Sequence, residues 1–93
     1  MNEITYNIIK TKPKDNLSYE YVVLYDTIDG INGYKPFFIA RRMIMNDRSY
    51  DYIEAGDFKG RRYKTVIGAE NDIKAMLLEN GINYKIKKGV NYD

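Results

Sequence analysis

The chain has 93 residues, of which 44% are hydrophobic and 30% are charged, and its formal net charge is +2. A chain of this length holds one hydrophobic core and is too apolar for a disordered tail, so we expect a single domain over residues 1–93. The absence of His and Cys excludes disulfides, thiolate nucleophiles, His general bases and the usual zinc and haem ligand sets. No targeting signal or membrane-spanning run is visible, so we expect a cytoplasmic protein without a cofactor.

The first half of the chain is predicted to form three strands. Residues 4–12 alternate apolar and polar side chains, and the turn residues 13–16 follow. Residues 17–28 give the clearest alternation. Residues 29–33 contain two glycines that favour a hairpin connection, and residues 34–45 are apolar on both faces, as in a central strand.

One helix is predicted over about residues 65–80, after a brief extended piece at 61–64. Thr65 is the expected N-cap, because its hydroxyl can accept from a free first-turn amide. Gly81 can adopt the left-handed conformation and end the helix. The residues between them that recur at helical spacing are Val66, Ala69, Ile73, Met76, Leu77 and Asn80.

Shorter segments complete the predicted sheet. Residues 46–48 form a turn, 49–53 a short fourth strand and 54–60 a polar loop. Residues 83–88 form a last strand or a basic edge, and residues 89–93 are expected to be frayed. The predicted fold is therefore α+β, an antiparallel sheet of four or five strands with one helix packed on one face. Which face the helix covers is left open.

Catalysis has little support in the sequence. Glu54 and Asp57 could form a carboxylate pair, although solvated loop acids are commoner. Ser18 and Ser49 lie in no nucleophile-elbow context. The Gly68 segment lacks the further glycines and the lysine of a phosphate-binding loop. We therefore expect a binding protein, with no catalytic or metal site.

The aromatic content points to one candidate binding surface. Tyr19, Tyr21 and Tyr25 fall on one face of the second strand. Cross-strand packing is the more common role for such a stripe, and an exposed aromatic platform for a protein partner is the alternative. Single-stranded nucleic acid is disfavoured here, because Glu20 and Asp26 are neighbours on the same strand.

The positive charge gathers in the middle of the chain, where residues 31–64 hold eight Lys or Arg against four acids. Arg41 and Arg42 are consecutive in a strand and must point to opposite faces. The basic residues either pair with Asp47, Asp51 and Asp57 or form a patch for an anionic partner. The candidate partner-binding arginines are Arg41, Arg42, Arg48, Arg61 and Arg62.

Residues 61–70, with Leu77 and Gly81, carry a local resemblance. Over residues 31–82 the chain resembles the arm-site DNA-binding domains of tyrosine integrases, in which three strands lead through a Lys-Thr step into a helix. That resemblance implies DNA contacts by Arg42, Arg48, Arg61 and Arg62 from the exposed sheet face. The chain departs from the family in its apolar third strand and in the acids Asp51, Glu54 and Asp57.

The Lys-Thr-x-x-Gly-Ala step, the small size and the lack of Cys also resemble short phage and mobile-element proteins, including anti-CRISPR inhibitors. This resemblance implies a stoichiometric inhibitor of a host defence nuclease complex, binding a protein or nucleoprotein partner. A small DNA-binding module is the alternative function, and a homo-oligomer that closes its sheet edges is a third possibility. No membrane partner is expected.

Overall fold

The computed structural model describes residues 3–27 and 35–92. It is an α+β fold with one helix on one face of an antiparallel sheet, as predicted. The hairpin connection expected at 29–33 lies outside the described residues. The elements are β1 (Glu3–Thr11), β2 (Leu17–Tyr25), β3 (Phe37–Met45), β4 (Arg48–Ser49), β5 (Ile53–Glu54), the 3₁₀ turn η1 (Gly56–Phe58), α2 (Val66–Glu79) and β6 (Tyr84–Tyr92).

Two tight turns shape the first part of the sheet. Asp15 and Asn16 have φ angles of 54° and 63°, and Asn46 and Asp47 have φ angles of 50° and 66°. Asn and Asp tolerate this left-handed conformation, which two-residue hairpin turns of type I′ require at both central positions. The predicted turns at 13–16 and 46–48 are therefore confirmed, and their residue types explain them.

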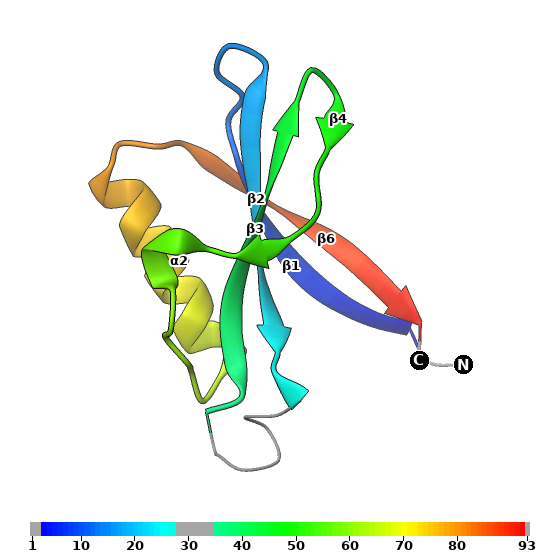
Figure 1. Ribbon diagram of the computed structural model, residues 1–93, viewed down its shortest axis with the longest axis vertical. Coiled ribbons are helices and arrows are strands. Elements are labelled where there is room, and N and C mark those ends of the chain that lie inside the picture. The colour runs from blue at the N-terminus through cyan, green and yellow to red at the C-terminus, as the bar shows by residue number, and fades with distance from the viewer. Residues whose placement is uncertain (1–2, 28–34, 93) are drawn as a thin grey trace.

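The sheet has the strand order β4-β3-β2-β1-β6, with β5 also paired to β3. β1 pairs with β2 at only two positions, Ile9 with Tyr21 and Lys10 with Glu20. By contrast, β1 pairs with β6 along its whole length. The β1–β6 ribbon therefore diverges from β2 and β3, and the sheet is strongly curled (Figure 1).

Three segment predictions need correction. Residues 89–92 are not frayed, because they pair with the first strand through contacts such as Glu3 with Tyr92. The predicted fourth strand is divided into β4 and β5, which pair with different parts of β3. The polar loop at 54–60 contains η1 and two buried apolar residues, Ala55 and Phe58. All three outcomes depend on contacts with distant segments, which local patterns do not show.

α2 packs on the face of the sheet that carries Tyr19 and Tyr21 (Figure 1). The Thr65 hydroxyl accepts a hydrogen bond from the Gly68 amide at 3.0 Å, which confirms the predicted N-cap. At the other end Gly81 has a φ of 66°. The wholly buried helix residues are Ala69, Ile73 and Leu77, which meet Ile9, Tyr21, Ile39, Ala55 and Phe58 in the main core.

Candidate functional site

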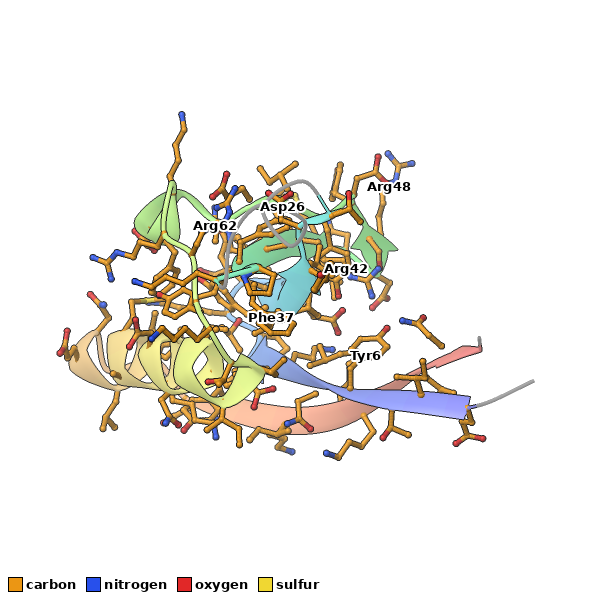
Figure 2. The ribbon with its side chains drawn as sticks, turned by 90° about the horizontal axis from the view of Figure 1, so that it is seen from below. Tyr6, Asp26, Phe37, Arg42, Arg48 and Arg62 are labelled. Carbon is orange, nitrogen blue, oxygen red and sulfur yellow. The ribbon has the colours of Figure 1, made fainter. Side chains whose placement is uncertain are left out.

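The sheet face opposite α2 is covered by no described helix, and we call it the open face. It consists of alternate residues of β1, β2 and β3 together with Tyr52, namely Tyr6, Ile8, Glu20, Val22, Phe38, Ala40, Arg42 and Tyr52. Ile8, Val22 and Ala40 form a small buried cluster, and the three aromatic rings pack around it with partial exposure. Figure 2 shows Tyr6 rising from the β1–β6 ribbon toward the side of Arg42. The curl of the sheet thus places Tyr6 of β1 on the same side as Arg42 of β3 (Figure 2).

Glu20 lies at the centre of the open face and is wholly buried. Its Oε1 accepts a hydrogen bond from Arg42 Nε at 2.8 Å and lies 2.6 Å from Arg42 Nη2. Lys87 Nζ lies 2.5 Å from its Oε2, an ion pair without the alignment of a good hydrogen bond. Glu20 therefore joins cations from β3 and β6, two strands that are not neighbours in the sheet.

The opposite charges around Glu20 shift the pKa values of both Glu20 and Arg42. Burial by itself raises the pKa of Glu20, but the adjacent Lys87 and Arg42 outweigh it and hold that pKa below its usual value. Burial likewise lowers the pKa of Arg42, but the hydrogen bond to Glu20 and the electrostatic effects of Tyr52, Glu20 and Tyr6 together outweigh it, so the pKa of Arg42 is raised. Glu20 and Arg42 therefore stay charged at neutral pH. The two cations compensate the charge of the buried carboxylate.

Arg42 is also held from its other side. Its guanidinium carbon lies 4.8 Å from the centroid of the Tyr52 ring, a cation–π distance. Burial raises the pKa of Tyr52, so its ring stays neutral. Nη1 of Arg42 makes no ion pair or hydrogen bond to a described residue. The guanidinium is therefore fixed in place and keeps donors directed away from Glu20.

Arg62 forms a second fixed guanidinium at the margin of the same face. It pairs with Asp26 at 3.2 Å and with Glu54 at 3.0 Å, and its guanidinium carbon lies 5.0 Å from the Phe38 ring centroid. Figure 2 shows Arg62 and Asp26 on the same side of the molecule. The backbone amide of Gly60 and then Arg62 lower the pKa of Glu54. Glu54 thus has a structural role.

The possible carboxylate pair of Glu54 and Asp57 does not form among the described contacts. Glu54 accepts from Arg62 and from the Gly60 amide at 3.0 Å. Asp57 is exposed in the turn η1 and makes no described hydrogen bond or ion pair. The geometry therefore offers no paired acid and base at these two positions.

The predicted Tyr stripe separates into three environments. Tyr21 is 4% exposed beneath α2. Tyr19 packs against the same core and carries the Arg41 guanidinium 4.5 Å from its ring centroid. Tyr25 is 54% exposed and meets Phe37 edge-on, with ring centroids 5.7 Å apart. Packing is therefore the role of Tyr21, and of these three Tyr25 offers the most surface to a partner.

The predicted arginines do not form one patch. Arg41 and Arg42 point to opposite faces, as strand alternation requires. Arg61 lies on the α2 side, over Phe58 and 4.0 Å from an oxygen of Asp72. Arg48 is exposed on β4 and makes no ion pair with a described residue (Figure 2). Only Arg42 and Arg62 belong to the open face and its margin.

The acids that pair with the arginines also differ from those expected. The sequence suggested Asp47, Asp51 and Asp57, which lie close along the chain. The observed partners are Glu20, Asp26, Glu54 and Asp72. Cross-strand neighbours are set by sheet register, which brings Glu20 directly opposite Arg42 although 22 residues separate them.

Sequence reasoning missed Tyr6, Tyr52, Glu20 and Lys87 as members of the site. The alternation at residues 4–8 could have identified Tyr6 as an inward aromatic. The other three have no local signal. The meeting of Glu20 with Lys87 depends on the pairing of β1 with both β2 and β6, and that of Tyr52 with Arg42 follows the pairing of β5 with β3.

A broad groove of about 1010 Å³ lies on the opposite side, between the C-terminal end of α2 and the 12–15 turn. Arg41 and Tyr19 line it, but so do Asp15 and Asp57. The C-terminal end of a helix also disfavours anions. The groove therefore selects no single ligand charge.

No helix in the described part of the chain has the length and apolar character needed to cross a membrane. Among residues 3–27 and 35–92 no group of three or more acidic residues is arranged to hold a metal ion. Comparison with known proteins gave no match to a family model, to a curated protein or to a solved structure. The function must therefore be inferred from the side chains themselves.

Proposed function

We propose that this chain is a non-catalytic binding domain that engages a protein partner through the open face. The observation that carries the proposal is the fixed guanidinium of Arg42, held between buried Glu20 and the Tyr52 ring on a face with partly exposed aromatic rings. Arg and Tyr are, with Trp, the residues enriched at the energetic centres of protein interfaces. A side chain that is already ordered loses less entropy when a partner binds.

Apolar side chains extend this surface outward. Ile4 on β1 and Leu24 on β2 follow the alternation that places Tyr6, Ile8 and Val22 on the open face, and both are exposed. An apolar centre with charged groups at its margin is the usual composition of a protein interface. The open face therefore fits a protein surface better than a bare polyanion.

Inhibition of a host defence nuclease complex is our more specific hypothesis for the partner. It is supported by the resemblance of the sequence to phage and mobile-element proteins. The open face adds a surface through which a stoichiometric inhibitor could act without chemistry of its own.

DNA binding in the manner of integrase arm domains is the alternative. That mode requires Arg42, Arg48, Arg61 and Arg62 to offer their charge from one sheet face. Arg42 and Arg62 are paired with carboxylates, and Arg61 lies on the side of α2. These contacts favour the protein-binding proposal.

Affinity capture tests the proposal with matched variants. The tagged domain would be used as bait in a lysate of cells that naturally carry it, and recovered proteins would be quantified. The open-face variant is Ile4→Asp with Leu24→Asp, and the control is Ile67→Asp with Leu78→Asp on the outer side of α2, where both residues are exposed. We expect a partner that the control retains and the open-face variant loses.

Two results would overturn the proposal. One is a folded wild-type domain that captures no protein above background. The other is a partner that both variants retain equally.

A further inference from the structure

The paired segments of β1 and β6 bring three lysines together. Lys10 lies directly opposite Lys85 in the antiparallel register. Lys12 follows β1, and its amide donates to the Asn83 carbonyl at 2.8 Å, which continues the pairing toward α2. Like charges opposite each other destabilise a sheet. The facing of Lys10 and Lys85 therefore adds no electrostatic stability to the pairing of β1 with β6.

Lys10, Lys12 and Lys85 line a hollow of about 600 Å³. Its remaining lining residues carry no carboxylate, being Thr11, Pro13, Asn83 and Tyr84. The hollow thus concentrates positive charge, and it adjoins the mixed groove beside α2, with which it shares Lys12.

The three lysines also lack partners within the described chain. None of them forms an ion pair or a side-chain hydrogen bond with residues 3–27 or 35–92. Glu20 is the cross-strand neighbour of Lys10, but its two oxygens are taken by Arg42 and Lys87. This contrasts with Arg42 and Arg62, whose charges are compensated.

We propose that this lysine hollow binds the phosphate groups of a nucleic-acid backbone. Lysine ammonium groups are point charges with freely rotating donors, which suits contact with successive phosphates without reading bases. A nucleic-acid strand brings one charge for about every 3.4 Å of helix axis, whereas an extended peptide points a side chain to the same side only every ~7 Å. The denser polyanion matches three ammonium groups gathered at one hollow.

This site goes beyond the proposed function and does not depend on it. It uses residues other than the Arg set of the integrase resemblance. Because Lys10 pairs with Glu20, the hollow adjoins the open face. A nucleoprotein partner could therefore contact both surfaces at once.

The test is fluorescence anisotropy with a labelled single-stranded oligonucleotide and a duplex of equal length, over a salt titration. Three phosphate contacts predict that log K falls with log salt at a slope of about −2 for the single strand and about −2.7 for the duplex. The triple variant Lys10→Gln, Lys12→Gln and Lys85→Gln is expected to bind at least tenfold more weakly at low salt, with a slope near zero.

The matched control removes the same number of positive charges elsewhere, as Lys35→Gln, Lys59→Gln and Lys74→Gln. It is expected to retain the wild-type slope. Circular dichroism and thermal unfolding verify that each variant is folded, and the single variant Lys85→Gln replaces the triple variant if the latter unfolds.

Three outcomes would overturn the site. The first is no binding by the folded wild type at low salt. The second is an equal loss in the control, which would indicate net charge alone. The third is binding of poly-L-glutamate as tight as that of the oligonucleotide, with the same dependence on the three lysines, which would indicate an acidic protein segment instead. None of these results bears on capture of a protein by the open face.

Discussion

Glu20 of β2 and Arg42 of β3 stand directly opposite each other in the antiparallel ladder, with the carboxylate wholly buried and the guanidinium 2.6 Å away. Lys87 of β6 reaches the second carboxylate oxygen. The pair therefore links the body of the sheet to the β1–β6 ribbon, and it positions Arg42 on the open face.

Removing the carboxylate should destabilise the protein through Arg42 and Lys87. We expect Glu20→Gln to lower the free energy of unfolding by about 2 kcal/mol, because both cations are partly exposed and can turn to solvent. Urea unfolding of Glu20→Gln, Arg42→Gln and the double variant checks this as a cycle. Additive single effects would show that Glu20 and Arg42 are not coupled.

Lowering the pH should remove the stabilisation that the Glu20 carboxylate gives through Arg42 and Lys87. The pKa of Glu20 is lowered in the folded protein, so its contribution is present above the unfolded pKa of about 4.3 and is lost as the pH falls through the folded value. Glu54 has a lowered pKa as well and acts in the same direction. We expect the melting temperature of the wild type to fall more steeply below about pH 4 than that of Glu20→Gln. Parallel curves from pH 7 to pH 2 would contradict this.

Gly89 of β6 lies beneath the Tyr6 ring, and a Cβ at this position would come within 2.2 Å of that ring. We expect Gly89→Ala to displace Tyr6 from the open face and to destabilise the fold by about 1 kcal/mol, because the ring end can move. Chemical denaturation, with NMR of the Tyr6 ring protons, measures both effects.

Gly56→Ala is the control for Gly89→Ala, because a Cβ there meets no atom within 4 Å. When Tyr6 is first replaced by Leu, the ring that a Cβ at position 89 would meet is absent. Adding Gly89→Ala to Tyr6→Leu should therefore cost much less stability than Gly89→Ala costs in the wild type. An unchanged Tyr6 signal in Gly89→Ala would refute the contact.

Leu77 and Leu78 are adjacent in α2 but differ in burial. Leu77 is wholly buried, whereas Leu78 is 77% exposed. We expect Leu77→Ala to cost about 2–5 kcal/mol of unfolding free energy and Leu78→Ala less than about 0.5 kcal/mol. Thermal and urea unfolding distinguish them. Similar losses of stability for both variants would mean that α2 turns a different side toward the sheet.

The sequence by itself determined the local elements. The start of α2 at the Thr65 cap and its end before Gly81 could be predicted from the sequence. Capping and the left-handed conformation depend on residues within one helical turn, so a local pattern contains them. The Asp15–Asn16 turn followed from residues that tolerate positive φ. The opposite orientations of Arg41 and Arg42 followed from the two-residue period of a strand.

Only the tertiary structure decided how these elements meet. The pairing of Glu3 with Tyr92, the burial of Glu20 between β3 and β6, and the facing of Lys10 with Lys85 join segments far apart in the chain. Strand register and the choice of the covered face are set by the whole core at once, so no local pattern contains them. Both proposed binding surfaces, the open face and the lysine hollow, arise from those long-range pairings.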